Sequence, residues 1–409
     1  MIYPRVSLYA LMLAAVGIPL YIHLPRFASV ELGIGLGTLG TLLLALRVID
    51  LVQDPALGWA IDRWPERQGL FAMLAATGLA VGFPLLFSLQ VGTSVTLKLF
   101  LVLVLLFSAY SLGSILLYGR SATLAERADD SGLMTLAAFR EGGMLAGVLL
   151  SAIAPAALVA LGAAHQGYPA FGYLLGGLAI ATAVLTRPMW RRPVVRGEGF
   201  RLADLADAGA LRLLLLALVN SLPVAVTSTL FLFFVEDRLQ LAGMAGPLLV
   251  LFFLSAGLSV PLWTAASHRI GPRATLLVAM PLAILGFSGA ALLAPGNLAG
   301  FALVCLLSGA ATGADLVILP AMFSIVLTRS RINASMAFGI WSFATKLGLA
   351  LAAATLLPLL DRFGFVPGTA NSARSLGALN LAYAVLPCAL KLVALALVFT
   401  LPAKEHRLA

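Results

Sequence analysis

The chain of 409 residues is 61% hydrophobic and only 11% charged, and its mean hydropathy is +1.04. Soluble domains carry about 25% charged residues, so this composition excludes an ordinary soluble protein and indicates an integral membrane protein. The formal net charge of +9 is spread over the ends of apolar segments and not gathered in one patch, which argues against a nucleic-acid partner.

Twelve apolar segments follow one another along the chain. Each is near the ~20 residues that a helix needs to cross ~30 Å of hydrocarbon at ~1.5 Å per residue. The sequence therefore predicts an all-α membrane protein with twelve transmembrane helices in two groups of six. The predicted spans are residues 6–24, 36–60, 70–90, 97–118, 134–161, 168–185, 211–235, 241–267, 274–293, 299–327, 332–359 and 379–401.

The most polar stretch of the chain separates the sixth span from the seventh. It predicts an N-terminal six-helix bundle over residues 1–186, a cytoplasmic linker over 187–210 and a C-terminal six-helix bundle over 211–409. Basic residues are concentrated in alternate loops, beginning with Arg63 and Arg67, and such residues resist translocation. Both termini are therefore expected in the cytoplasm. The preference for arginine over lysine amid abundant alanine, leucine and glycine favours a bacterial inner membrane.

The loops after the second and eighth spans resemble each other. "GWAIDRWPERQGL" and "PLWTAASHRIGPRATL" both contain an aromatic residue, a short polar turn and basic residues before a new apolar run. Their corresponding positions in the two groups of six indicate a duplication. This organisation resembles the major facilitator architecture, whose substrate site lies between two six-helix halves near the middle of the membrane.

Residues that support catalysis or bind metals form no recognisable constellation in the sequence. Cys305 and Cys388 lie in predicted spans, where we expect them to pack as small apolar side chains. The four histidines are widely separated, so they offer no metal-ligand spacing, and neither a Walker loop nor a nucleophile elbow is present. We therefore predict no enzymatic activity and no cofactor.

The second span contains four polar side chains in the middle of an apolar helix. Arg47, Asp50, Gln53 and Asp54 fall within about 120° of one another on a helical wheel. Asp50 lies about 21 Å into the span, close to the depth of the bilayer centre, where a charged Asp costs roughly 2.5–3.5 kcal/mol. Such residues normally face a water-filled cavity and find partners, so this wedge is a candidate ion site. Pro55 also removes a backbone donor beside it.

Other polar residues in predicted spans complete the inventory of candidate site residues. They are Ser111 and Ser114 in the fourth span, Arg140 and Glu141 in the fifth, Asn220 in the seventh, Asp315 in the tenth, Lys346 in the eleventh and Lys391 in the twelfth. Whether Asp315 and Lys391 face a cavity is left open by the sequence.

The stretch "RVIDLVQDPALGWAIDR" resembles the helix-two signature of the glycoside-pentoside-hexuronide:cation symporters, the melibiose-permease-like branch of the major facilitator superfamily. "FREGGMLAG", "LVNSLPVAVTSTLFLFFVEDRL", "GADLVILPA" and "FATKLG" are similar to later parts of that family, so the resemblance covers the whole chain. It implies a monomeric secondary active transporter among membrane lipids. Such a carrier moves a small polar solute, sugar or glycoside-like, together with H⁺ or Na⁺ by alternating access.

The resemblance also implies roles for individual residues. Asp50 and Asp54 correspond to carboxylates that hold the coupling cation, with Gln53 and Ser111 beside them and Na⁺ as the one possible metal ion. Arg47 and Glu141 belong to the charge network. The implied solute-binding residues are Arg140, Tyr118, Ser114, Asn220, Asp315 and Lys346, of which Tyr118 stacks on the sugar and Lys346 lies near the cation site, where it can pair with an aspartate.

Two departures from the family pattern concern the solute. The family places acidic residues that grip sugar hydroxyls where this chain has Ala14 and Ser114. Hydrogen bonds to a carboxylate are roughly twice as strong as neutral ones, so recognition of the sugar is expected to be altered. Gln53 stands where the family has Asn, and its additional methylene crowds a compact Na⁺ site, which favours H⁺ or a loosened ion selectivity.

Several alternatives remain open at this point. The protein can be an exporter or carrier of an amphiphilic, lysolipid-like solute, or a transporter-like sensor that binds without moving solute. Asp50 and Asp54 can be purely structural partners of Arg47 or Lys346, and Arg140 can belong to a helix-end network with Glu141. Tyr118 can anchor the helix at the membrane interface, and Asp315 can serve packing or gating.

Overall fold

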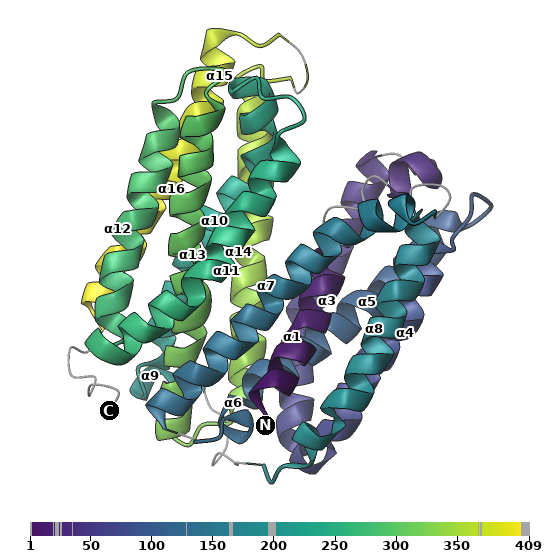
Figure 1. The fold of residues 1–409 in the computed structure, drawn as a ribbon, viewed down its shortest axis with the longest axis vertical. Helices are drawn as coiled ribbons and strands as arrows, with labels where there is room; N and C mark the ends of the chain where they lie inside the picture. The colour runs from purple at the N-terminus through teal and green to yellow at the C-terminus, as the bar shows by residue number, and fades with distance from the viewer. Residues whose placement is uncertain are drawn as a thin grey trace. The chain divides into compact units, whose positions relative to one another are not determined.

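The computed structural model describes residues 2–18, 20, 24, 27–34, 36–127, 129–162, 167–194, 202–366, 368 and 370–401, and every regular element among them is helical. Unsatisfied backbone groups are costly in hydrocarbon, so helices are the expected solution for an apolar chain. The long helices are α1 (Tyr3–Ile18), α3 (Leu36–Arg63), α4 (Gln68–Phe87), α5 (Val95–Gly119), α7 (Asp130–Ala160), α8 (Tyr168–Thr186), α10 (Ala210–Phe233), α11 (Ala245–Ile270), α12 (Pro272–Ala291), α13 (Leu298–Arg329), α14 (Ala334–Arg362) and α16 (Leu386–Phe399) (Figure 1).

Shorter helical segments connect the long helices. They are η2 (Phe27–Glu31), η3 (Pro65–Arg67), α6 (Ser121–Leu124), η5 (Arg187–Arg191), α9 (Leu202–Asp207), η6 (Phe234–Arg238), α15 (Ala373–Asn380) and η7 (Leu381–Val385). Because α15, η7 and α16 follow one another without a break, the predicted twelfth span is longer than expected at its N-terminal end.

The predicted all-α membrane fold is confirmed. Nine helices of the described chain are long and apolar enough to cross a membrane. The remaining predicted spans correspond to α1, to the charged helix α3, and to α14. Residues 19 and 21–23 of the predicted first span (6–24) lie outside the described residues, as do parts of the linker (195–201) and the last eight residues of the chain.

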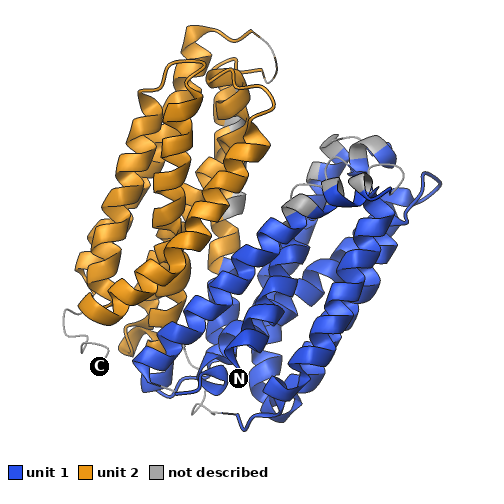
Figure 2. Ribbon diagram, in the orientation of Figure 1, with its two compact units in different colours: residues 1–202, 327–343 blue, residues 203–326, 344–409 orange. Residues whose placement is uncertain are grey.

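Contacts group the chain into two compact units, which Figure 2 shows in different colours. Unit 1 contains Met1–Leu202 and Leu327–Phe343, and unit 2 contains Ala203–Val326 and Ala344–Ala409. Helix α14 therefore begins in unit 1 and ends in unit 2. This grouping differs from the predicted boundaries at 327–343, and the predicted division into halves and linker stays a prediction.

Close helix packing in unit 1 depends on small residues. Helix α4 packs on α8, where a Cβ atom on Gly172 would lie 2.8 Å from the carbonyl oxygen of Phe83, and one on Gly176 would lie 2.8 Å from that of Ala80. Backbone atoms cannot move aside as a side chain can, so glycine permits this approach. Gly172 and Gly176, one turn apart on α8, therefore permit the close packing of α8 on α4.

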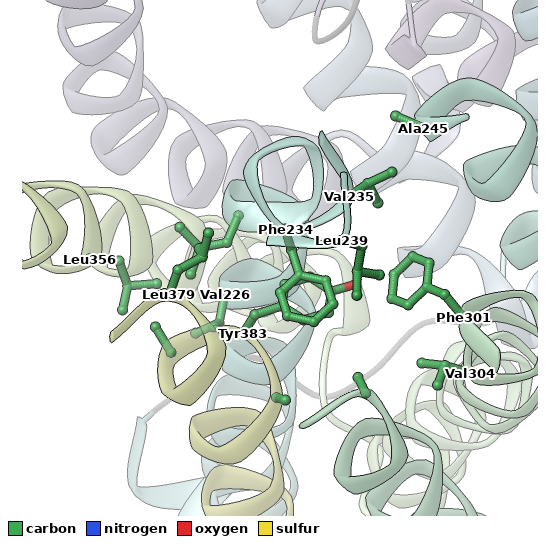
Figure 3. Packing of buried hydrophobic residues seen from close by; sticks show 14 of the residues in the cluster. Val226, Phe234, Val235, Leu239, Ala245, Phe301, Val304, Leu356, Leu379 and Tyr383 are labelled. Atoms are coloured by element: carbon green, nitrogen blue, oxygen red, sulfur yellow. The ribbon is translucent and has the colours of Figure 1, made fainter. Parts of the chain in front are cut away.

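The core of unit 2 contains a stack of aromatic rings. The rings of Phe234 in η6 and Tyr383 in η7 are stacked, with centroids 4.0 Å apart and an interplanar angle of 12°. Phe301 of α13 lies 5.6 Å from Phe234, and all three side chains are buried among the aliphatic residues of Figure 3. Rings of this size dominate the energetics of a core, so they hold η6, α13 and η7 together.

Candidate functional site

The four polar residues of α3 lie in unit 1, and the first two form an ion pair. Arg47 Nη1 is 3.0 Å from Asp50 Oδ2, one helical turn away. The guanidinium also lies 5.2 Å from the ring centroid of Phe107 on α5. Asp50 is only 3% exposed, so its charge is compensated within the bundle, as a buried carboxylate requires.

Gln53 and Asp54 accept hydrogen bonds from two serine hydroxyls. Ser108 Oγ of α5 donates to Gln53 Oε1 at 2.8 Å, and Ser342 Oγ of α14 donates to Asp54 Oδ2 at 2.8 Å. Asp54 is fully buried. Gln53 Nε2 is buried and has no hydrogen-bond partner among the described residues, although an unmet donor normally costs about 1–3 kcal/mol. Ser111 is buried on α5, one turn beyond Ser108, and its predicted role as an ion ligand stays a prediction.

Arg140, Glu141 and Tyr118 form a second buried network in unit 1. Arg140 Nε donates to Glu141 Oε1 at 2.8 Å, and the Tyr118 hydroxyl donates to the same oxygen at 2.7 Å. The guanidinium lies over the Tyr118 ring, 3.7 Å from its centroid, and its Nη1 donates to Ser121 Oγ at 3.3 Å. One face of the Tyr118 ring, predicted to stack on a sugar, is therefore covered by Arg140.

Some polar atoms of unit 1 are buried without a hydrogen-bond partner among the described residues. They include Arg140 Nη2, Ser114 Oγ and the hydroxyl of Tyr9. Tyr9 lies close to α5, since a Cβ atom on Gly113 would be 3.2 Å from its hydroxyl oxygen. Ala14 is buried on α1. Sequence reasoning missed Tyr9, because a single tyrosine in the middle of an apolar helix carries no distinctive pattern.

Three predicted polar residues of unit 2 lie together. Lys391 of α16 donates from Nζ to Asn220 Oδ1 of α10 at 2.6 Å and forms an ion pair with Asp315 Oδ2 of α13. All three residues are buried, and Asp315 Oδ1 has no hydrogen-bond partner within the described chain. Lys346 is half-buried on the part of α14 that belongs to unit 2, and its predicted pairing with an aspartate stays a prediction.

Sequence reasoning missed a carboxylate that caps a helix. Asp62, at the end of α3, accepts hydrogen bonds from the backbone N–H groups of Met336 (2.8 Å) and Ser335 (3.3 Å) in the first turn of α14. A negative charge is favourable at a helix N-terminus. Arg120 Nη1 lies 3.6 Å from Asp62 Oδ1, and burial lowers the pKa of the Arg120 guanidinium, an effect that Asp62 opposes. The signal in the sequence is the acid of "GWAIDRW", which stands at the end of an apolar span.

The polar networks of the described residues offer ion and solute chemistry. Within the part of the chain that the structure describes, no group of three His, Cys, Asp or Glu side chains is placed to hold a metal ion. Buried carboxylates on α3 can exchange a proton or hold a monovalent cation with neighbouring oxygen atoms, while the Arg140 network offers hydrogen-bonding groups for a polar solute.

The sequence matches the model of the family described as MFS/sugar transport protein over residues 6–405. The chain belongs to this family. This MFS transporter is therefore a multi-pass membrane protein with a small-molecule solute, and it is not an enzyme. Among curated proteins, no relative matches the chain.

Solved structures are similar to this MFS transporter in fold. A bacterial homologue of the iron transporter ferroportin, in its outward-facing state, has a TM-score of 0.73 at 15% identity, covering 96% of this chain and 99% of that one. The MFS transporter FucP in its outward conformation has a TM-score of 0.68 at 13% identity, with coverage of 96% and 98%. A variant of the E. coli fucose:proton symporter FucP has a TM-score of 0.66 with the same identity and coverage. At such identities the likeness shows the major facilitator fold alone.

Proposed function

We propose that this MFS transporter is a cation-coupled symporter of the glycoside-pentoside-hexuronide:cation branch, which moves a small polar, sugar-like or glycoside-like solute by alternating access. The observation that carries the proposal is the pair of buried carboxylates Asp50 and Asp54, one turn apart in the middle of α3. Each costs roughly 2.5–3.5 kcal/mol at the bilayer centre, and a coupling ion gives these charges a function.

The coupling ion that we favour is H⁺. One of the two lone pairs on the oxygen of Gln53 accepts from Ser108, and the amide nitrogen of Gln53 is a donor that cannot ligate a cation. Asp54 accepts from a neutral hydroxyl, that of Ser342, and a carboxyl group can take up a proton without further ligands. Ion arrival at Asp50 and Asp54 neutralises charge and prepares the carrier for solute, so that only the empty or the doubly loaded carrier changes access.

The solute side of the proposal rests on the Arg140 network. Arg140 Nη2 and Ser114 Oγ have no hydrogen-bond partner among the described residues, and hydroxyl groups of a solute can satisfy such atoms. Sugar transport also agrees with the description of the matching family, and one structure of similar fold is named a fucose:proton symporter. We place the carrier, as a monomer, in a bacterial inner membrane.

Replacement of Asp54 by Asn tests the proposal. We expect Asp54→Asn to abolish gradient-driven accumulation of solute in proteoliposomes, because the amide cannot exchange a proton, while the thermal stability of the purified protein stays close to that of the wild type. Downhill exchange of labelled solute is expected to persist. Accumulation against a gradient by a folded Asp54→Asn protein would contradict the proposed coupling.

The identity of the ion has its own test. Gln53→Asn introduces the residue that the resembled family has at this position and removes one methylene. We expect this variant to show more stimulation of uptake by Na⁺, compared with stimulation by a pH gradient, than the wild type. Ser288→Ala, at an exposed position of α12, serves as the matched control and should leave the ion preference unchanged. Equal Na⁺ stimulation in Gln53→Asn and the wild type would remove Gln53 from the ion site.

One observation favours a second candidate, a carrier of an amphiphilic solute. Ala14 and Ser114 occupy positions at which the resembled symporter family has carboxylates that bind sugar hydroxyls. Ala14 is apolar and buried. Proteoliposome uptake of labelled glycosides, compared with uptake of a lysolipid, separates the two solute classes. A sensor that binds without transport would show stabilisation by ligand without counterflow.

A further inference from the structure

Four arginines lie at one end of unit 1, where α3 ends, α4 begins and α8 ends. These arginines, Arg63, Arg67, Arg187 and Arg191, are all exposed and are called the arginine corner below. Helix α4 packs on α8 (Figure 1), and η5 packs on both. Because η3 joins α3 directly to α4, all three helix ends meet at the same end of the bundle.

Hydrogen bonds hold the two sides of the arginine corner together. Gln68, which follows Arg67, donates from Nε2 to the carbonyl oxygen of Trp190 at 3.0 Å and to that of Arg192 at 2.8 Å. Arg191 lies between these two acceptors in the chain. A Cβ atom on Gly69 would also lie 3.8 Å from the Trp190 side chain, so the start of α4 and η5 are in contact.

The side chains of the four corner arginines have no ion-pair or hydrogen-bond partner among the described residues, unlike those of three other arginines of unit 1. These three form ion pairs with carboxylates: Arg120 pairs with Asp62, Arg127 with Asp129, and Arg329 with Asp130. In contrast, none of the four corner arginines forms an ion pair or a hydrogen bond through its side chain with a residue that the structure describes. Glu66 is the acidic residue within the η3 turn, so the corner keeps a net positive charge that is available to an external anion.

Exposed apolar side chains lead along α3 to the corner. Val48 and Val52 are 61% and 72% exposed and share a face of α3 with Trp59, opposite the face of Asp50 and Asp54. Trp59 and Trp64 are 52% and 43% exposed, with ring centroids 5.8 Å apart. Exposed tryptophans next to arginines at the end of a membrane helix are typical of the headgroup level of a bilayer.

We propose that the arginine corner binds the phosphodiester headgroup of an anionic phospholipid from the surrounding bilayer. Guanidinium groups match phosphate geometry with paired hydrogen bonds, and basic pockets between transmembrane helices bind anionic headgroups. In this arrangement Trp59 and Trp64 lie at the level of the lipid glycerol, and the exposed face with Val48 and Val52 contacts an acyl chain. Retention of positive loops in the cytoplasm explains the presence of the arginines, but it does not explain why these four have no side-chain partner among the described residues and adjoin exposed indole rings.

Tryptophan quenching by brominated lipids tests the site on the full-length protein. Phosphatidylglycerol brominated on its acyl chains is titrated into the purified protein in phosphatidylcholine nanodiscs, and brominated phosphatidylcholine provides the reference. We expect the wild type to prefer the anionic lipid about tenfold or more at low salt, because each basic side chain contributes to attraction of anionic lipid. The preference should fall as NaCl is raised.

Matched variants separate the corner from total charge. Arg63→Gln/Arg67→Gln and Arg187→Gln/Arg191→Gln should each lower the preference to about twofold or less, whereas replacement of all four by Lys should keep most of it. The control Arg212→Gln/Arg269→Gln removes two exposed charges from unit 2 and should leave the preference unchanged. Either double variant suffices if the other fails to fold. The proposal is overturned if the wild type shows no preference, if the control loses as much as the corner variants, or if soluble polyglutamate displaces the lipid.

Discussion

Arg140 is the largest of the fully buried side chains described, and its surroundings show why a membrane helix retains it. The guanidinium is stacked on Tyr118, bonded to Glu141 and bonded to Ser121. A planar cation with hydrogen bonds at several nitrogen atoms fits this environment, whereas an ammonium group is a compact point charge that cannot stack on the ring and reach both oxygens in the same plane. The residue is therefore held in one orientation by its neighbours.

Replacement of Arg140 by Lys tests the importance of that geometry. The charge is kept, but the stacking on Tyr118 and one of the hydrogen bonds are lost, which should cost about 1–3 kcal/mol. We expect solute uptake to fall about tenfold in proteoliposomes. The control Tyr118→Phe keeps the ring and removes only the bond to Glu141, so its uptake should fall less. Wild-type uptake by Arg140→Lys would show that charge alone is sufficient.

The buried group of Asn220, Asp315 and Lys391 makes a different prediction. Lys391→Met alone leaves a buried carboxylate without its countercharge, which typically destabilises by about 3–5 kcal/mol. The double variant Asp315→Asn/Lys391→Met removes both charges and should recover most of the loss. The midpoint of thermal unfolding in detergent measures both effects. If the single and double variants unfold at the same temperature, the ion pair contributes nothing.

At the scale of elements, the first turn of α14 is held against α3 and α5 by close backbone contact. A Cβ atom on Gly58 would lie 2.5 Å from the carbonyl oxygen of Ser335, and one on Gly119 would lie 2.6 Å from the Cα of Ser335. Asp62 caps the same turn. Together these contacts explain why Leu327–Phe343 packs with unit 1.

Gly58→Ala should therefore destabilise the protein by about 1–3 kcal/mol, because the added methyl group meets backbone atoms that cannot rotate away. Gly177→Ala in α8 is the matched control, since a Cβ atom there meets nothing within 4 Å. Alanine is the better helix former by about 1 kcal/mol, so this control should be neutral or stabilising. Thermal unfolding in detergent compares them, and equal behaviour of the two variants would contradict the close packing of α14 on α3.

At the scale of the whole molecule, the charge of the loops predicts the topology. Basic residues resist translocation, and they are concentrated in alternate loops. We expect green fluorescent protein fused to the C-terminus to fluoresce and alkaline phosphatase fused there to be inactive, since both results indicate a cytoplasmic location. A phosphatase fusion between α3 and α4 should be inactive as well, and one between α4 and α5 should be active. An active C-terminal phosphatase fusion would overturn the predicted orientation.

Composition and spacing were sufficient to predict the helical membrane fold. Apolar segments of spanning length must form helices in hydrocarbon because every backbone group needs an internal partner, and this argument requires no tertiary contact. The sequence also predicts that Asp50 and Asp54 face a water-filled cavity and find partners, and their role as an ion site stays a prediction. The structure shows both side chains buried.

The sequence alone could not predict the partners of these charges, except where both residues lie in the same helix. The pair of Arg47 and Asp50 follows from a spacing of one turn, whereas Ser342 lies 288 residues after Asp54. Likewise, Lys391 meets Asn220 and Asp315 only because α10, α13 and α16 lie together in unit 2. The twelve-helix membrane protein and its polar wedge were thus determined by local hydrophobicity and helical period. The pairing of each buried charge was decided by tertiary packing, since it depends on which helix faces meet.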